Sequence, residues 1–253
     1  MKITELIEKP LEVSEEHYLL KIKSDEKPLP GQFINIRVQD GTDPLIRRPF
    51  SVFNYENSIL EIIVKVAGRG TRILSSRSPG MIDIIGPLGK GFTLPENRNV
   101  LIAGGGVGNA PLYYLSKVLS ERGCRITYLY GANRADNIFL EKYYSSASDE
   151  FFLFTDDGSK GERGYVTSGI ETLLHRSQKK FDIIYVCGPL AMIKKSSEIT
   201  GDIPLEVSME NYFGCGIGLC MGCSVETLNG LKRACVEGPV FNGHEIDWLN
   251  LSR

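Results

Sequence analysis

Residues 101–111 read LIAGGGVGNAP, an apolar strand that runs into a cluster of glycines and then into a helical stretch. A junction of this kind directs free helix amides at an anion, as the pyrophosphate of a dinucleotide requires. The spacing departs from the usual fingerprint, because G-x-G-x-x-G counted from Gly104 needs glycine at position 109, where Asn109 stands. No Lys-Ser or Lys-Thr pair follows to form a triphosphate-binding loop. The stretch therefore indicates a dinucleotide site of an unusual type.

This junction belongs to an alternation of strands and helices that begins after Pro95. Strands are expected near 99–103, 125–130, 150–155, 182–186 and 204–209. Helices are expected near 109–122 (ended by Gly123), 137–146, 168–177 (capped by Thr167 or Ser168) and 189–198. The alternation predicts a five-stranded parallel sheet covered by helices, an α/β nucleotide domain. Cys187-Gly188-Pro189 ends the fourth strand, at the edge where such sheets bind ligands, although a structural turn explains this tripeptide equally well.

Before Pro95 the apolar residues mostly alternate with polar ones. Residues 32–38 and 59–66 each place a row of aliphatic side chains on one face, and turns rich in Gly, Pro and Asp separate such strands. The two rows are Ile34, Ile36 and Val38, and Leu60, Ile62, Val64 and Val66. The pattern predicts a small antiparallel β-barrel or sandwich, with the domain boundary within Pro95–Asn99.

Four of the six cysteines lie between positions 215 and 235. Cys215, Cys220 and Cys223 have the spacing C-x4-C-x2-C, and Cys235 follows after eleven residues. This is the plant-type spacing for four thiolates that hold a 2Fe-2S cluster. Glycines between these cysteines let the loop bend tightly, and a hairpin turn at Asn229-Gly230 would bring Cys235 back beside the loop.

A zinc site is the alternative interpretation of these cysteines. Zinc sites commonly use two C-x2-C knuckles or a mixture of Cys and His. Here only one such knuckle exists, and His244 is nine residues beyond Cys235. Cys124 opens an expected buried strand and is interpreted as a small core residue.

Two short segments in the first part of the chain have residues that suit phosphate binding. Residues 47–51 read Arg-Arg-Pro-Phe-Ser, and Gly68-Arg69-Gly70-Thr71 precedes a short helical stretch. Arginine pairs with phosphate in a bidentate manner, and glycine lets the backbone approach it. Each segment alone is a weak signal, since a surface turn explains it as well.

Taken in order, Arg48-Pro49-Phe50-Ser51, Gly70-Thr71, GGGVGNAP and Cys187-Gly188-Pro189 resemble the ferredoxin-reductase family of flavoproteins. With the cysteine-rich tail and the ending ACVEGPVFNGHEIDW, nearly the whole chain resembles the electron-transfer subunits of NAD-dependent (type B) dihydroorotate dehydrogenases. The resemblance implies a β-barrel FAD domain at 1–97, an NAD-binding α/β domain at 98–209 and a small 2Fe-2S module at 210–253.

The resemblance also implies roles for individual residues. Arg48, Pro49, Phe50 and Ser51 would hold the flavin ring and phosphate of FAD, Ile63, Val64 and Lys65 would line the flavin, and Gly70 and Thr71 would meet its pyrophosphate. Gly104, Gly105, Gly106 and Gly108 would receive NAD, with Cys187 and Gly188 near its nicotinamide. The cluster ligands would be Cys215, Cys220, Cys223 and Cys235. Asn133 and Arg134 are candidates for the adenosine end, an exposed loop pair being the alternative. NAD is expected rather than NADP.

The implied partner is an FMN-containing dihydroorotate dehydrogenase catalytic subunit, in a heterotetramer with two copies of each chain. Electrons would pass from that subunit through the 2Fe-2S cluster and FAD to NAD+, in pyrimidine biosynthesis. A flavoprotein subunit of a ferredoxin-dependent NADPH oxidoreductase or of a sulfide dehydrogenase is similar in the same segments and stays open. A redox sensor without turnover and a free-standing reductase are further alternatives.

Composition narrows the remaining function classes. Lys and Arg number 29 against 31 Asp and Glu, a net charge of −2, so a nucleic acid or other polyanion is not an expected partner. No apolar run reaches the length of a membrane-spanning helix, and the amino terminus lacks the features of a secretory signal, so a cytoplasmic location is expected. His17, His175 and His244 form no catalytic triad and are expected at the surface or at helix ends.

Overall fold

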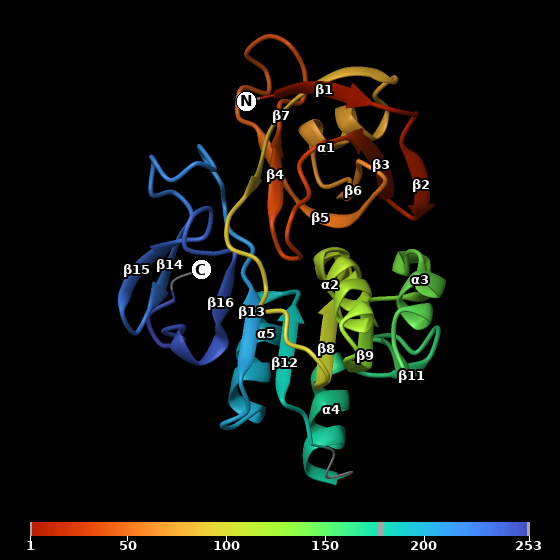
Figure 1. The fold of residues 1–253 in the computed structure, drawn as a ribbon, viewed down its shortest axis with the longest axis vertical. Coiled ribbons are helices and arrows are strands. Elements are labelled where there is room, and N and C mark those ends of the chain that lie inside the picture. Colours follow the sequence, from red (N-terminus) through yellow and green to blue (C-terminus); the bar gives the residue numbers. More distant parts are fainter. Residues whose placement is uncertain (1, 177–179, 252–253) are drawn as a thin grey trace.

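The computed structural model of the chain describes residues 2–176 and 180–251. A barrel, a sheet layered with helices and a small carboxy-terminal module are visible as three regions in Figure 1. The carboxy-terminal module lies beside the other two regions, next to strands β4 and β13. Within the described ranges, no helix is long and apolar enough to cross a membrane.

The amino-terminal region is an antiparallel barrel. Its strands run in the order β1-β7-β4-β5-β6-β3, and pairing of β1 with β3 closes the ring, while β2 lies outside on β3. The elements are β1 (Lys2–Leu6), β2 (Leu11–Ser14), β3 (His17–Lys23), β4 (Phe33–Ile36), β5 (Arg48–Glu56), β6 (Ile59–Lys65), α1 (Arg69–Ser75) and β7 (Gly80–Leu88). Closure pairs the edges that an open sheet would leave exposed.

The barrel interior contains the two predicted rows of aliphatic residues. The Ile34, Ile36 and Val38 row meets the Leu60, Ile62 and Val64 row, and all six side chains are buried. Alternate residues of a strand face opposite sides, so the residues between them point outward toward the rest of the chain. Val66 follows the end of β6 and is only half-buried, so it does not extend the row.

The second region is a sheet in which all five predicted strands are present and parallel. They are β8 (Asn99–Gly105), β9 (Arg125–Ala132), β10 (Glu150–Thr155), β12 (Ile183–Cys187) and β13 (Leu205–Ser208). Two short edge strands extend the sheet: β11 (Glu162–Arg163) is parallel to β10, and β16 (Val240–Asn242) is antiparallel to β13. The order is β11-β10-β9-β8-β12-β13-β16.

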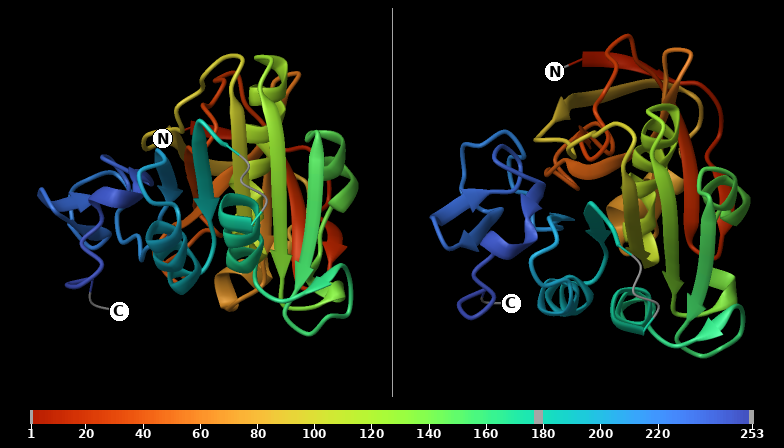
Figure 2. Two further views of the ribbon diagram at one scale, coloured as in Figure 1. Left: turned by 90° about the horizontal axis from the view of Figure 1, so that it is seen from below. Right: turned by 60° about the horizontal axis from the view of Figure 1, so that its bottom comes forward.

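Helices cover both faces of this sheet. On the barrel side lie α2 and the short α3, whose Tyr143 and Tyr144 lie beside Phe53. The helices α4 and α5 lie side by side on the opposite face (Figure 2). Tyr113 of α2 stacks on Phe53 of the barrel with 4.8 Å between ring centroids, so α2 joins the two regions. The helical elements are η1 (Gly106–Asn109, a 3-10 turn), α2 (Ala110–Glu121), η2 (Ala135–Asn137), α3 (Glu141–Ser146), α4 (Val166–Glu171), η3 (Thr172–Arg176, a π-helical turn), α5 (Leu190–Ile199) and η4 (Gly243–Glu245).

The predicted start of the third helix was wrong. Its N-cap is Tyr165, and Thr167 and Ser168 lie inside the first turn of α4. Val166 is buried against the sheet, and this packing outweighs the capping preference of the hydroxyl residues that follow it. The predicted end at residue 177 lies outside the described residues. Gly123 ends α2 as expected, with a positive φ of 75°.

The carboxy-terminal module consists of the loop 211–223, called the cysteine loop below, and the hairpin of β14 (Ser224–Thr227) and β15 (Gly230–Arg233). The predicted hairpin exists, but its turn lies one residue earlier than expected. Thr227 pairs with Gly230, which leaves Leu228 and Asn229 between the strands. Gly230, with a φ of 90°, is the first residue of β15.

Candidate functional site: two adjoining cavities and a cysteine loop

A cavity of about 220 Å³ lies between the barrel, the start of α2 and the chain that follows β13. Pro49, Phe50 and Ser51 of β5 line it together with Ile63 and Lys65 of β6. Its wall thus contains five of the residues expected to contact FAD. The remaining wall residues are Phe33, Val107, Ala110, Pro111, Ser208, Met209, Glu210, Asn211, Phe213 and Pro239.

The expectation for Val64 requires a correction. Its side chain is fully buried in the barrel interior, on the opposite face of β6 from Ile63. Ile63 belongs instead to the apolar cluster between barrel and sheet. Strand alternation separates these neighbours, so the Val64 side chain cannot line the cavity.

Arg48, Gly70 and Thr71 lie near one another but not on this cavity wall. A Cβ atom on Gly70 would lie 3.1 Å from Nε of Arg48, so the arginine side chain passes closely over this glycine. The Thr71 hydroxyl accepts hydrogen bonds from the backbone N–H groups of Ala67 (2.9 Å) and Gly68 (3.1 Å). Thr71 therefore stabilises the start of α1, next to the arginine.

A second cavity, of about 470 Å³, lies at the carboxyl edge of the parallel sheet. Gly105, Gly106, Gly108 and Gly188 line it, as expected for a dinucleotide site. The other wall residues are His17, Lys65, Val107, Gly131, Ala132, Asn133, Asn137, Asp156, Tyr165, Val166, Thr167, Pro189, Ala191, Met192, Lys195 and Glu210. Lys65, Val107 and Glu210 line both cavities, so the two spaces adjoin.

Asn109 explains the unusual glycine spacing. Its buried amide donates to the carbonyl oxygens of Gly106 (2.9 Å) and Gly131 (3.2 Å), and its Oδ1 accepts from the Tyr128 hydroxyl (3.1 Å). A Cβ atom on Gly104 would lie 2.0 Å from this Oδ1. Gly104 therefore leaves room for the Asn109 side chain; it is buried and is not among the residues that line the cavity.

Cys187 is also off the cavity wall. Its side chain is 2% exposed, and burial holds the pKa of the thiol far above its usual range, with Glu210 adding to the shift. Cys187 is therefore a neutral thiol at neutral pH. Gly108 packs directly on this strand end: a Cβ there would lie 2.6 Å from the Cys187 carbonyl oxygen and from Gly188 N and Cα.

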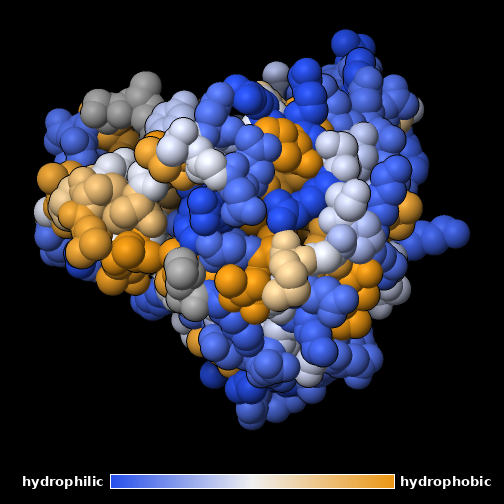
Figure 3. Space-filling view, turned by 90° about the horizontal axis from the view of Figure 1, so that it is seen from above, coloured by the Kyte–Doolittle hydropathy of each residue, from blue (hydrophilic) through white to orange (hydrophobic). Residues whose placement is uncertain are grey.

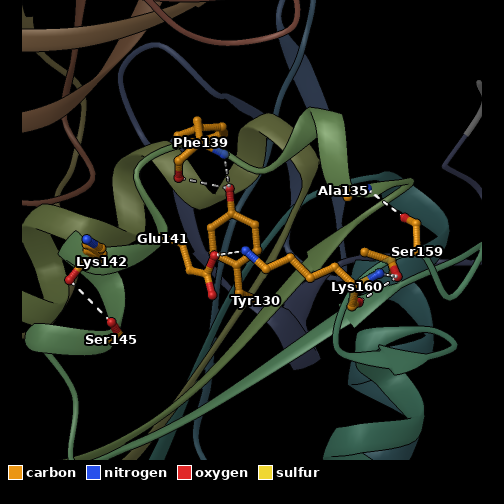
Figure 4. Close-up of polar contacts among 9 residues, drawn as sticks. Tyr130, Ala135, Phe139, Glu141, Lys142, Ser145, Ser159 and Lys160 are labelled. Carbon is orange, nitrogen blue, oxygen red and sulfur yellow. Dashed lines mark hydrogen bonds and ion pairs between the residues drawn. The ribbon is translucent and has the colours of Figure 1, made fainter.

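Asn133 lines the nucleotide cavity, whereas Arg134 does not and pairs with Glu15 of the barrel. The segment after Asn133 is held from several sides. Ser159 Oγ accepts a hydrogen bond from the backbone N–H of Ala135 at 2.7 Å. The Tyr130 hydroxyl donates to the Phe139 carbonyl oxygen and accepts from the Phe139 N–H (Figure 4). An ion pair between Lys160 and Glu141 lies alongside (Figure 4). This wall of the cavity is therefore well supported.

His17 was wrongly expected at the surface or at a helix end. It begins β3, is 2% exposed and lines the nucleotide cavity. Its Nδ1 lies 2.7 Å from the Glu15 carbonyl oxygen, which can only accept, so Nδ1 carries the proton. Burial lowers the pKa of His17, which keeps the ring neutral. The other two histidines contact backbone carbonyls and line neither cavity. Cys124 is a core residue as expected.

Several cavity residues were not predicted. Asp156 directly follows β10, and Glu210, Asn211 and Phe213 follow β13. The rule that ligands bind outside the carboxyl ends of parallel strands points to all of them, once it is applied to every strand of the sheet. Val107 lies within the glycine loop, where an apolar side chain gave no separate signal.

The four expected ligands, three in the cysteine loop and Cys235 just after β15, form two pairs. The backbone N–H of Cys215 donates to Cys220 Sγ at 3.4 Å, and the thiols of Cys223 and Cys235 lie close enough to influence each other's protonation. In the described part of the chain, no group of three or more metal-binding side chains is gathered tightly enough for a single ion. Two pairs suit the two irons of a 2Fe-2S cluster, each of which takes two thiolates, better than one zinc ion.

Backbone amides and one ion pair support these thiols. The N–H of Gly218 donates to Cys235 Sγ (3.1 Å) and that of Leu219 to Cys215 Sγ (3.3 Å). The Ile217 N–H lowers the pKa of Cys215 to about 6, whereas burial raises the pKa of Cys235 to about 12. Amides directed at sulfur favour the thiolate form that binds iron.

Arg233 braces the loop from the hairpin. Its guanidinium donates to the Gly218 carbonyl oxygen (2.7 Å) and pairs with Glu237 (2.5 Å). This arginine lowers the pKa of Glu237 to about 2. Arg233 lies two positions before Cys235, and Gly218 lies between Cys215 and Cys220. Their hydrogen bond therefore connects the two parts of the chain that carry the cysteines.

Comparison with known proteins supports each part of this arrangement. Residues 210–247 match the iron-sulfur cluster binding domain of dihydroorotate dehydrogenase B, and residues 101–198 match the oxidoreductase NAD-binding domain. The chain is 38% identical to the dihydroorotate dehydrogenase B (NAD(+)) electron transfer subunit of Desulforamulus reducens, over 87% of both chains. It is 34% identical to that of Fusobacterium nucleatum, over 98% of this chain and 99% of the relative.

Solved structures show the same fold. The NADH-dependent reduced ferredoxin-NADP oxidoreductase structure superposes with a TM-score of 0.88 and 33% identity, covering 99% of this chain and 92% of the other. A ferredoxin NADP+ reductase from Neisseria gonorrhoeae with bound FAD and NADP superposes at 0.66 and 15% identity, covering 80% and 91%. From the relatives that match over nearly its full length, together with the paired cysteines and the adjoining cavities, the chain belongs to the family of dihydroorotate dehydrogenase B (NAD(+)) electron transfer subunits.

Proposed function

We propose that this chain passes electrons from an FMN-containing catalytic subunit, which oxidises dihydroorotate to orotate, through a 2Fe-2S cluster and FAD to NAD+. The observation that carries the proposal is the order of the three sites. The nucleotide cavity shares Lys65, Val107 and Glu210 with the flavin cavity. Asn211 and Phe213, at the start of the cysteine loop, line the flavin cavity but not the nucleotide cavity. The proposed place in metabolism is pyrimidine biosynthesis.

The order of the sites suits the chemistry of the three cofactors. Nicotinamide exchanges two electrons as hydride and an iron-sulfur cluster exchanges one, so a flavin between them converts one mode into the other. The residues of this chain would bind the three cofactors and orient them relative to one another. The β5 residues 49–51, with Ile63 and Lys65, would hold the flavin ring, and Arg48 with the nearby turn at Gly70 and Thr71 would hold the FAD phosphates. Gly105, Gly106, Gly108 and Gly188 would receive NAD, and the four paired thiols would ligate the cluster.

The choice of NAD over NADP rests on Asp156. This carboxylate lies on the wall of the nucleotide cavity at the carboxyl end of β10, with Asp157 beside it. Partial burial, with a contribution from Asp157, raises the pKa of Asp156. The Asp156 carboxylate would repel the 2′-phosphate of NADP but accept hydrogen bonds from the free ribose hydroxyls of NAD.

The partner would dock over the cysteine loop. Cys220 is exposed there, in a segment that also exposes several large apolar side chains. The exposed side chains are Tyr212, Ile217, Leu219, Met221 and, beyond the loop, Val236. Figure 3 shows hydrophobic residues gathered at the left of this face of the molecule. An apolar patch around an exposed electron-transfer site fits a protein partner. We propose a cytoplasmic heterotetramer with two copies of each chain, and a division of this chain into domains 1–97, 98–209 and 210–253.

A second candidate has its own support. The structure that superposes with a TM-score of 0.88 is of an NADH-dependent reduced ferredoxin-NADP oxidoreductase, and the chain matches it at 33% identity along 99% of its length. This chain would then be the flavoprotein subunit of such an enzyme. The apolar patch suits either partner, so it does not separate the two candidates.

Anaerobic titration of the purified complex with NADH tests the core of the proposal. NADH should bleach the flavin absorption and then produce the electron paramagnetic resonance signal of a reduced 2Fe-2S cluster. Mass spectrometry of the copurifying chain identifies the partner. A complex that contains no flavin, or no cluster, would contradict the proposal.

A further inference from the structure

Strand β4 lies between the flavin cavity and the cysteine loop. Its outward-facing residues are Phe33 and Asn35, since Ile34 and Ile36 point into the barrel. Phe33 lines the flavin cavity, and its ring lies 5.0 Å from that of Phe213 in the cysteine loop. Asn35 is paired in the sheet with Pro49, another residue of the cavity wall. One strand face thus contacts both sites.

Asn35 is hydrogen-bonded to the loop. Its Nδ2 donates to the carbonyl oxygen of Cys215 at 3.3 Å, and the residue is 1% exposed. The next residue, Gly216, has a positive φ of 68°, and a Cβ there would lie 1.9 Å from Asn35 Nδ2. Only glycine allows the loop backbone to approach the amide this closely.

The amide has no competing role within the barrel. Among the described residues, Asn35 Oδ1 has no hydrogen-bond partner although it is buried, and the bond to Cys215 is the one that Nδ2 makes. A buried amide with an unpaired oxygen costs stability relative to an apolar side chain. Barrel packing therefore does not account for asparagine here, whereas contact with the loop does.

We propose that Asn35 is a positioning residue that fixes the Cys215–Gly216 peptide against the flavin-binding strand and thereby sets the rate of electron transfer between FAD and the cluster. The step is a one-electron transfer between the cluster and the flavin, with no bond made or broken between heavy atoms; when NADH is the reductant, the electron would pass from the flavin to the cluster. Electron transfer slows steeply as the flavin and the cluster move apart. A cysteine loop that is held less firmly should therefore lower the rate of electron transfer between them. The inference rests on the proposed cofactors but not on the identity of the partner.

Asn54 provides a matched control. It is also a buried asparagine on a barrel strand, its Nδ2 donates to Glu61 Oε2 at 3.0 Å, and its Oδ1 likewise has no partner in the described chain. It lies on β5, and among the described residues its side chain is hydrogen-bonded to Glu61 and not to the cysteine loop. Asn54→Ala therefore removes the same chemical group from the same barrel without touching the loop.

The test reduces the purified complex with NADH under anaerobic conditions. Stopped-flow absorption follows flavin reduction, and rapid freeze-quench electron paramagnetic resonance follows the reduced cluster. In Asn35→Ala, FAD content, iron content and the rate of flavin reduction should match the wild type, while cluster reduction slows several-fold. Amide hydrogen exchange in residues 213–217 should rise about five-fold, the factor for roughly 1 kcal/mol of lost hydrogen bonding. Asn54→Ala should leave the cluster step unchanged.

Gly216→Ala tests the same contact from the loop side. In the single variant, the added methyl group collides with the Asn35 side chain, and cluster reduction should be slower than in the wild type. In the double variant with Asn35→Ala the collision is absent, so the alanine at 216 should cost less than it does in the wild type. Additive effects, or wild-type cluster reduction in Asn35→Ala, would overturn the inference. A wild-type complex without flavin or cluster would overturn the proposed function as well, which distinguishes the two failures.

Discussion

Replacement of Gly108 by alanine should damage the nucleotide cavity while leaving the flavin cavity intact. Gly108 lies where the glycine loop packs on the end of β12. An added Cβ would lie 2.6 Å from three backbone atoms, the Cys187 carbonyl oxygen and Gly188 N and Cα. Ordinary contacts between such atoms are about 3.5 to 4.0 Å long. The two loops must therefore separate by roughly 1 Å, and both contribute to the cavity wall.

The energetic cost follows from this overlap. Overpacking of a tight site typically costs about 1 to 3 kcal/mol, and here the opposing atoms are backbone, which cannot rotate away. A cost of about 2 kcal/mol that falls on NADH binding corresponds to roughly thirty-fold in affinity. Gly201→Ala is the matched control: Gly201 has a φ of 57°, a Cβ atom added there would meet nothing within 4 Å, and the residue lines neither cavity. Alanine there costs only backbone strain of about 1 kcal/mol.

NADH oxidation with an artificial acceptor measures the effect, with bound FAD quantified in the same preparation. Gly108→Ala should raise KM for NADH roughly thirty-fold at unchanged flavin content. Gly201→Ala should lower thermal stability slightly and leave KM unchanged. An unchanged KM in Gly108→Ala would refute the packing argument and, with it, the assignment of this loop to the nucleotide.

Cys220→Ser should remove the visible absorption of the cluster and lower its iron content, while FAD stays bound; unchanged iron and sulfide would exclude Cys220 as a ligand. Asp156→Ala should improve kcat/KM for NADPH relative to NADH by roughly five-fold or more, because it removes a charge that repels the 2′-phosphate; an unchanged ratio would remove Asp156 from nucleotide selection. Arg233 lowers the folded-state pKa of Glu237 to about 2. The pair therefore stabilises the cysteine loop at pH values above the ordinary carboxyl pKa, and this stabilisation is lost as the pH falls toward 2. Glu237→Gln should flatten the loss of cluster with acidification over that range, as followed by absorption, and an unaltered acid profile would contradict the role of the pair.

Much of the fold could be predicted because local patterns and tertiary packing agree. Alternation alone placed Ile34 and Ile62 inside the barrel, and the change of period near Pro95 separated barrel from parallel sheet. Strand β16 was not predicted because a segment of three residues is too short to show a periodic pattern. It forms by pairing with the edge of β13, a tertiary contact that local sequence does not report. The start of α4 depends on burial of Val166, which sequence propensity does not report.

The candidate site was predictable to the extent that its residues carry motifs. The cysteine spacing and the β5 residues after Arg48 are such motifs. A glycine in the sequence, by contrast, does not indicate what its backbone packs against. Gly104 accommodates Asn109 and Gly105 lines the cavity, and the sequence alone did not distinguish them. Asn35 carries no motif, and its importance emerges only from the loop that packs on it from 180 positions away.

The central claim is that this chain connects NAD with the oxidation of dihydroorotate in a partner subunit. The most direct test purifies the chain with its copurifying partner and compares orotate-linked NADH oxidation with ferredoxin-linked NADPH oxidation in the same preparation. We predict that orotate supports rapid NADH oxidation, that Cys220→Ser abolishes it, and that ferredoxin with NADPH gives no comparable rate. Ferredoxin-linked NADPH oxidation without any response to orotate would contradict the account and favour the second candidate.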